Sequence, residues 1–235
     1  MTAAVRDLQA NYGREVALAR WMATRGAPVV HTWEPAGPFV RDGLVISLWH
    51  EAETGSPVTA AAAGDGLRRC HEALRSFPDP LPPLSSLFDE AERIVDSMTI
   101  ADADRNTFCD AFLHARRLLG NHGLPEQPLH GDAGLGNVLS GGVWHDWEDS
   151  CHGPLIWDLA SLVSTARITG VRAERAEATL RAYGDAPGLE QLDAFVALRG
   201  LQVLAWSLLM STTRGYLRAS TETRLSWLRA EHWRA

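Results

Sequence analysis

Lysine is absent from this sequence, and all 22 of its basic residues are arginine. The chain therefore has no lysine with which to clamp a phosphate or form a Schiff base. The 29 acidic residues give a formal net charge of −7. Because binding to nucleic acid normally needs a basic face, this composition argues against a nucleic-acid partner.

Cysteine and targeting signals are also scarce. Cys70, Cys109 and Cys151 are odd in number and lack CxxC spacing, which is typical of reduced thiols rather than of a disulfide framework. The start, Met1 to Leu8, lacks the apolar core of a signal peptide. The longest apolar run, Phe195 to Met210, contains polar residues and is too short to span a bilayer, so it predicts a buried helix. We therefore expect a cytoplasmic protein without a membrane partner.

Apolar content is ample: 46% of the 235 residues are hydrophobic, enough for one large domain or two small lobes. Apolar residues recur at helical spacing from Val5 through Leu8 to Met22 and predict a helix over residues 3–24. Glu15 falls inside this stripe, where a carboxylate is costly unless it is paired or hydrogen-bonded. The alternative is a glutamate at the edge of the stripe that reaches solvent.

Two strands and then a series of helices follow. Val29-Val30 and Phe39 to Trp49 read as strands, the second turning at Arg41-Asp42-Gly43, with Leu44 to Trp49 as a buried strand. His71 is expected to be a core histidine. Further helices are predicted over residues 57–76, 87–98, 104–119, 157–167, 171–183, 189–211 and 220–233. The second part of the chain is thus expected to be mainly helical.

The residues that carry chemistry lie between two of these helices. His130-Gly131-Asp132 is followed by Asn137 and Asp146, in a pattern of loop, short strand, Gly-Gly turn and short strand. Each of these residues alone could simply stabilise a turn or lie exposed in a loop. Together they match the needs of phosphoryl transfer, which are a carboxylate that orients a hydroxyl and hard oxygen ligands that hold magnesium.

This segment resembles the catalytic and metal-binding region of the aminoglycoside phosphotransferase and choline kinase family, small-molecule kinases with a protein-kinase-like fold. The matching positions, in the order of that family, are His130, Gly131, Asp132, Asn137 and Asp146, followed by Gly153-Pro154 and Trp157-Asp158-Leu159-Ala160. Gly134 and Leu135 depart from the pattern, because the family often has His and Pro there. The departure concerns the substrate side of the loop more than its metal side.

The resemblance implies an α+β, two-lobe fold, with a truncated N-terminal lobe over residues 1–50 and a mainly α-helical C-terminal lobe over residues 51–235. It implies ATP or GTP as phosphoryl donor and Mg²⁺ as cofactor. Asp132 would be the catalytic base with His130 beside it in the catalytic loop, Asn137 and Asp146 would be the magnesium ligands, and Asp158 would be a structural residue.

The resemblance also implies a nucleotide site. Glu15 would belong to the helix whose glutamate pairs with the nucleotide-binding lysine, and the backbone from Leu48 through Trp49 to His50 would meet the base. Four acidic residues that could face a cationic substrate, or simply be solvated, are Glu148, Asp149, Glu190 and Asp193.

The family's phosphate-covering loop and strand lysine are missing before Glu15. A misplaced start, a native truncation and a degenerate kinase are three explanations. Two functions follow: phosphoryl transfer to a hydroxyl of an aminoglycoside-like compound, amino alcohol or sugar, or nucleotide binding without turnover. A metal hydrolase built from His130, Asp132, His145, Asp146 and His152 is a third possibility, but neighbours on a strand point to opposite faces, so His145 and Asp146 should not share a metal.

Overall fold

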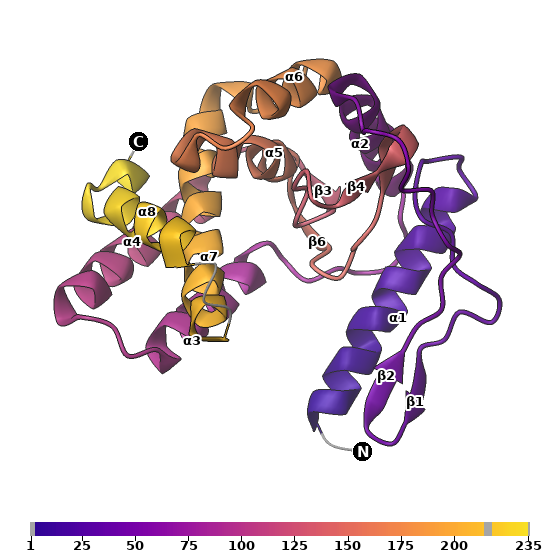
Figure 1. Cartoon of the computed structure of the whole chain (residues 1–235), viewed down its shortest axis with the longest axis horizontal. Helices are drawn as coiled ribbons and strands as arrows, with labels where there is room; N and C mark the ends of the chain where they lie inside the picture. Colours follow the sequence, from indigo (N-terminus) through magenta and orange to yellow (C-terminus); the bar gives the residue numbers. More distant parts are fainter. Residues whose placement is uncertain (1–2, 214–217, 235) are drawn as a thin grey trace. The chain divides into compact units, whose positions relative to one another are not determined.

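The computed structural model describes residues 3–213 and 218–234 (Figure 1). Contacts within the chain divide it into two units that interleave along the sequence. The first comprises residues 1–81, 127–152 and 178–184, and the second comprises residues 82–126, 153–177 and 185–235. The division into lobes at residue 50 stays a prediction, since neither unit is a continuous stretch of chain.

Helix α1 (Ala3–Ala23) confirms the first predicted helix. Its buried face holds Glu15, Val16, Leu18 and Met22. Leu8 was expected in this face but is 46% exposed, and the side chain of Val5 lies outside the described residues. Periodicity records only the spacing of apolar residues, whereas burial also requires a neighbouring element to cover each turn.

The first unit also contains the hairpin of β1 (Phe39–Arg41) and β2 (Leu44–Ile46). Asp42 and Gly43 have positive φ values of 52° and 81°, as a two-residue hairpin turn requires, so the predicted turn is confirmed. The buried strand predicted over Leu44 to Trp49 is wrong: β2 ends at Ile46, and Leu44 is 64% exposed. In the described residues this sheet has two strands, and Phe39, Val40 and Ile46 are also exposed although α1 contacts β2.

The predicted strand at Val29-Val30 is reduced to a bridge. Val29 pairs in parallel with Trp144, and Thr32 pairs with Trp49. Helix α2 (Ala60–Leu74) confirms the helix predicted over residues 57–76 and begins with Thr59, whose side chain accepts a hydrogen bond from the Ala62 N–H. His71 is buried on α2 and bonds the Tyr183 hydroxyl at 2.9 Å.

Two more small sheets carry the segment of interest. Strand β3 (Glu126–Leu129) pairs with β6 (Cys151–Pro154). Strand β4 (Val138–Leu139) pairs with β5 (Val143–Trp144) through the 3₁₀ turn η1 (Ser140–Gly142). The predicted short strand, Gly-Gly turn and short strand are therefore confirmed.

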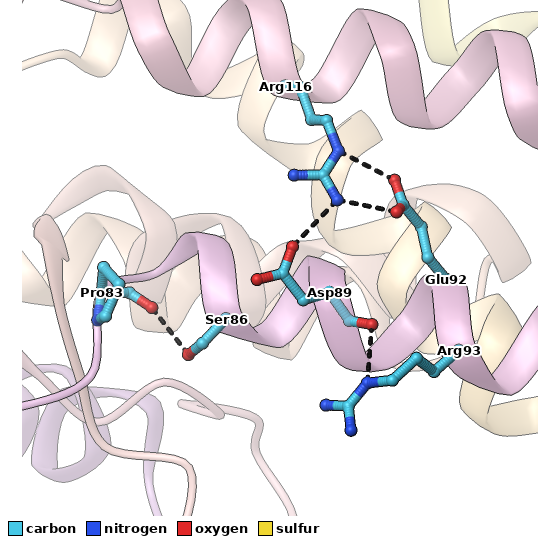
Figure 2. A network of polar contacts seen from close by, with 6 residues as sticks. All are labelled: Pro83, Ser86, Asp89, Glu92, Arg93 and Arg116. Carbon is cyan, nitrogen blue, oxygen red and sulfur yellow. Dashed lines mark hydrogen bonds and ion pairs between the residues drawn. The ribbon is translucent and has the colours of Figure 1, made fainter.

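Helices dominate the second unit, and the predicted ones are confirmed with shifted ends. They are α3 (Ser85–Ser97), α4 (Asp102–Asn121), α5 (Ile156–Thr169), α7 (Leu192–Thr213) preceded by η2 (Leu189–Gln191), and α8 (Arg218–Arg229) followed by η4 (His232–Arg234). The remaining helix, α6 (Ala173–Tyr183), crosses from one unit to the other along the chain. Arg116 of α4 joins α3 through Asp89 and Glu92 (Figure 2).

The long apolar helix over residues 189–212 is the one described segment with the length and composition to cross a membrane, but 61% of its apolar window is buried inside the structure. Its inner face includes Phe195, Leu201 and Leu204, and α3, α5 and α8 pack against it. Such burial is what a core helix requires, as the sequence predicted.

Candidate active site

Asp132 lies in the loop between β3 and β4, and its backbone is fixed on both sides. Its N–H donates to His130 Nδ1 at 3.3 Å. Its carbonyl accepts hydrogen bonds from the Asn137 side-chain amide at 2.9 Å and from the Gly134 N–H at 2.7 Å. The side chain remains half-buried. The loop therefore presents a carboxylate from a backbone that three hydrogen bonds hold in place.

Gly131 permits this loop conformation. It has a φ of +86°, which a residue with a Cβ rarely adopts. A Cβ at this position would also overlap the carbonyl of Asp149. The loop between β5 and β6 thus passes so close to the loop that carries Asp132 that only glycine fits at position 131.

His130 lies behind Asp132 and is fully buried. Because Nδ1 accepts the Asp132 N–H, Nε2 carries the ring proton and donates it to the His145 carbonyl at 3.0 Å. Its ring centroid lies 4.3 Å from that of Trp147 and 5.6 Å from that of Trp144. These contacts tie the loop that carries Asp132 to the end of β5.

Asn137 and Asp146 lie at the two open ends of the β4–β5 hairpin. The His145 N–H donates to the Asn137 carbonyl at 3.1 Å, which extends the hairpin pairing and brings the two ends side by side. Asp146 follows with a φ of 67°. The Asn137 amide nitrogen is engaged by Asp132, so its amide oxygen remains as an acceptor. An amide oxygen and a carboxylate are ligands of the kind that Mg²⁺ prefers, so these two residues fit that ion.

A cavity of about 290 Å³ joins this hairpin to α1. Its polar lining includes Glu15 and Asp146, and its apolar lining is formed by Val30, Trp49, Ala52, Leu139 and Trp147. A second cavity, of about 410 Å³, shares Val30 and Ala52 with it and is also lined by His50. The first cavity therefore combines apolar walls with an acidic end.

Glu15 is only 8% exposed, and its Oε1 accepts the Trp147 N–H at 3.2 Å. Burial raises the pKa of its carboxyl to about 7, the hydrogen bond from Trp147 opposes this rise, and the negative charges of Asp146 and Glu148 add to it. The predicted position of Glu15 in the buried stripe is confirmed. Within the described residues, the charges that act on it are both negative.

The segment predicted to meet a base is only partly free to do so. The Leu48 N–H donates to the Ala36 carbonyl at 2.8 Å, and the Leu48 carbonyl accepts the Trp33 N–H at 2.9 Å. The His50 N–H donates to the His31 carbonyl at 2.9 Å. Trp49 and His50 each line a cavity, whereas Leu48 lines neither of them.

Sequence reasoning missed Trp147, which follows Asp146 directly, and three further lining residues, Val30, Ala52 and Leu139. The last three are small or aliphatic residues outside any motif, and no spacing in the sequence marks them. Among them, Leu139 alone carried a signal, because it belongs to the strand that follows Asn137. Their place in the cavity depends on contacts between distant segments.

The other predicted site residues are divided between the units. Glu148 is exposed and Asp149 is half-buried in the first unit. Asp158 is fully buried in the first turn of α5, in the second unit. Glu190 and Asp193 are exposed in the second unit, where Asp193 pairs with Arg167 at 2.6 Å. The structural role of Asp158 and the substrate-binding role of the four other acids stay predictions.

A metal site made of protein groups alone is not supported. The part of the chain that the structure describes holds no group of three or more His, Cys, Asp or Glu side chains suited to a metal ion. This counts against the hydrolase built from His130, Asp132, His145, Asp146 and His152. An ion held partly by the phosphates of a nucleotide needs fewer protein ligands.

The fold is α+β and protein-kinase-like, of the kind found in aminoglycoside phosphotransferases and choline kinases. Residues 3–195 match the model of the phosphotransferase enzyme family. The chain belongs to this family, which confirms the resemblance. A search of functionally characterised proteins gave no match.

Solved structures with this fold include two kinases and one kinase family protein. A choline/ethanolamine kinase family protein from Mesorhizobium loti is 22% identical, with a TM-score of 0.64 over 93% of this chain and 77% of that one. The amicoumacin kinase hAmiN, in complex with AMP-PNP, Ca²⁺ and Ami, is 14% identical, with a TM-score of 0.69 over 92% and 76%. The choline kinase LicA from Streptococcus pneumoniae is 14% identical, with a TM-score of 0.66 over 95% and 81%.

Proposed function

We propose that this protein transfers a phosphoryl group from ATP or GTP to a hydroxyl group of a small molecule. The observation that carries the proposal is the arrangement of one hairpin and its preceding loop. Asp132 and Asn137 are hydrogen-bonded to each other in the loop, and Asp146 lines a cavity together with Glu15. Membership of the phosphotransferase family supports the same chemistry.

Asp132 is the base in this proposal. Its half-buried carboxylate accepts a hydrogen bond from the substrate hydroxyl and takes the proton as the oxygen attacks the terminal phosphorus. The bond from that phosphorus to the bridging oxygen breaks, and the nucleoside diphosphate leaves. The hydrogen bonds to the Asp132 backbone fix the point from which the carboxylate projects, which matters because phosphoryl transfer depends on alignment. His130 contributes by holding this loop against β5.

The cavity holds the nucleotide. Its apolar walls, which include Trp49 and Leu139, suit the faces of a purine base. Its acidic end, formed by Glu15 and Asp146, would repel phosphates, so nucleotide binding there needs a divalent cation, with Asp146 and Asn137 as its protein ligands. Mg²⁺, when bound by these two residues, supplies the positive charge that neutralises the phosphates.

The acceptor is a small hydroxyl compound, and an aminoglycoside-like molecule, an amino alcohol and a sugar are the three classes to test. Glu148 and Asp149 of the first unit are acids that would attract an amino group, and Glu190 and Asp193 of the second unit are separate candidates for that role. Solved structures of the same fold include kinases named for choline and for amicoumacin. Their TM-scores of 0.69 and 0.66 support the fold, and their sequence identities of 14% leave the acceptor open.

The test is transfer of labelled γ-phosphate from ATP or GTP to a panel of these compounds in the presence of Mg²⁺. Asp132→Ala should lower kcat by about 10²–10⁴-fold, the usual contribution of a positioned base, while its melting temperature stays close to that of the parent. Asp79→Asn, at an exposed loop position, is the matched control and should retain full activity. Equal turnover in Asp132→Ala would remove Asp132 as the base.

A binding module without turnover is the second candidate, and the environment of Glu15 favours it. Glu15 has negative neighbours, and the chain contains no lysine that could pair with it or clamp a phosphate. A thermal-shift scan with Mg²⁺ and nucleotides separates binding from its absence. Binding without product in the transfer assay would establish this candidate in place of the first.

A further inference from the structure

The second cavity, of about 410 Å³, adjoins the cavity that is proposed to hold the nucleotide. The two share Val30 and Ala52, and Leu139 of the first directly precedes Ser140 of the second. Both are lined by residues of the first unit alone. Val30, Ala52 and Val143 are half-buried, so the apolar part of the second cavity's wall is open to a ligand. A ligand of the first cavity that extends past Val30 and Ala52 therefore enters the second.

The second cavity is negatively charged. Its lining contains the carboxylates of Glu51 and Glu53, both exposed, and no arginine. Neither carboxylate forms an ion pair with another of the described residues. Phosphates would be repelled here, so they lie at the other end, where Asp146 holds the metal ion in the proposed function. The base, which is the uncharged part of a nucleotide, is consequently the part that reaches the two carboxylates.

Side-chain acceptors outnumber side-chain donors in this lining. Each of the two carboxylates offers two acceptor oxygens and no donor. The imidazoles of His31 and His50, when neutral, each offer one donor and one acceptor. The Ser140 hydroxyl already donates to the Ser56 carbonyl at 2.7 Å. A base that presents N–H groups at its edge is therefore matched better than one that presents lone pairs.

The two purine bases differ at the edge that would meet these acceptors. Guanine carries N1–H beside its N2 amino group, so it can donate two parallel hydrogen bonds to one carboxylate. Adenine carries the N6 amino group beside the lone pair of N1, so it donates one hydrogen bond while the second carboxylate oxygen faces that lone pair. Guanine is thus the base whose hydrogen-bonding groups the lining satisfies.

We propose that Glu51 and Glu53 select guanine over adenine, so that the phosphoryl donor of this protein is GTP in preference to ATP. This inference rests on the proposed function, because it assigns the base of the nucleotide whose phosphates lie at Asp146. The two glutamates take no part in the transfer step itself. Their loss should therefore change which nucleotide binds.

The test is calorimetric titration of the full chain with GDP, IDP and ADP in the presence of Mg²⁺. These diphosphates have no γ-phosphate to transfer, so their affinities report binding without turnover. Inosine keeps the N1–H of guanosine and lacks the N2 amino group, which makes IDP the probe for the second hydrogen bond. GDP should bind about five- to tenfold more tightly than ADP, as a charge-assisted hydrogen bond at an exposed site predicts, and IDP should lie between them.

The double variant Glu51→Gln, Glu53→Gln should bring the ratio of GDP to ADP affinity down to about one, because each glutamine offers adenine both a donor and an acceptor. The ratio is the readout, since removing negative charge alters phosphate binding equally for both nucleotides. The two single variants show how much each carboxylate contributes. Asp42→Asn, which removes an exposed carboxylate from the hairpin turn of the same unit, is the matched control and should keep the parent ratio.

Equal affinity of the parent for GDP and ADP, tighter binding of ADP, or an unchanged ratio in the double variant would overturn the selection of guanine. Each of these outcomes leaves the proposed phosphoryl transfer standing, because a nucleotide still binds. Absence of binding by all three nucleotides would count against the nucleotide site itself and hence against both proposals.

Discussion

Replacing Glu15 with glutamine should make the protein more stable at alkaline pH. The carboxyl of Glu15 is buried beside Asp146 and Glu148, and its pKa is raised from 4.5 to about 7. The folded state therefore holds a proton between these two pH values that the unfolded chain has already released. As a result, the free energy of unfolding should fall as the pH rises from 4.5 to 7 and then become constant.

The size of the effect follows from the same two values. A rise from 4.5 to about 7 corresponds to at most about 3 kcal/mol of stability lost when Glu15 ionises. Glutamine keeps an oxygen that can accept the Trp147 N–H, and it cannot ionise. Glu15→Gln should therefore match the parent near pH 4.5 and exceed it by up to about 3 kcal/mol at pH 8.

The assay is urea unfolding at several pH values between 4.5 and 8.5, in the presence of a chelator so that no divalent cation screens Glu15. Glu51→Gln, which removes an exposed carboxylate from the same unit, is the control and should stay within about 0.5 kcal/mol of the parent at every pH. Parallel pH profiles for the parent and Glu15→Gln, or a less stable variant at pH 8, would refute the reasoning.

Two further predictions concern single contacts. Gly131→Ala should lower the free energy of unfolding by more than about 2 kcal/mol, because the new Cβ would overlap the Asp149 carbonyl at a residue with a positive φ. Gly136→Ala, at an open position, is the control and should stay within about 0.5 kcal/mol of the parent. Chemical unfolding measures both variants, and equal losses of stability would contradict the account. Asp104→Asn should cost about 1 kcal/mol at neutral pH, because two hydrogen bonds from Arg229 lower the pKa of the Asp104 carboxyl. This difference should disappear as the pH falls below the pKa of Asp104 in the folded protein, and a constant difference down to pH 2 would argue against the pair.

The helices were predictable because their apolar stripes repeat over many turns. The α7 segment is long and almost wholly apolar, and its burial followed from length and composition. The hairpin turn at Asp42-Gly43 was predictable from its chemistry alone. Burial of the following strand was not, because Leu44 to Trp49 has the residues of a core strand, but α1 contacts β2 without burying Leu44, Ile46 and Leu48.

The candidate site likewise contains residues that local sequence predicts and contacts that it does not predict. Asp132, Asn137 and Asp146 could be read from their order, because a loop and a hairpin place them close together in the sequence. The contact between Glu15 and Trp147 joins residues that are 132 positions apart. The cavity at that contact, with Val30 and Ala52 in its wall, arises from packing of distant segments and has no signature in the sequence.

The most direct test of the central claim is calorimetric titration of a non-hydrolysable ATP or GTP analogue with Mg²⁺ into the parent, Asp132→Asn and Asp146→Asn. If Asp146 holds the metal–nucleotide complex and Asp132 serves only the transfer step, Asp132→Asn should bind like the parent, and Asp146→Asn should bind about tenfold or more weakly, a loss of about 1.4 kcal/mol or more. Equal affinity in Asp146→Asn, or no binding by the parent, would contradict the account.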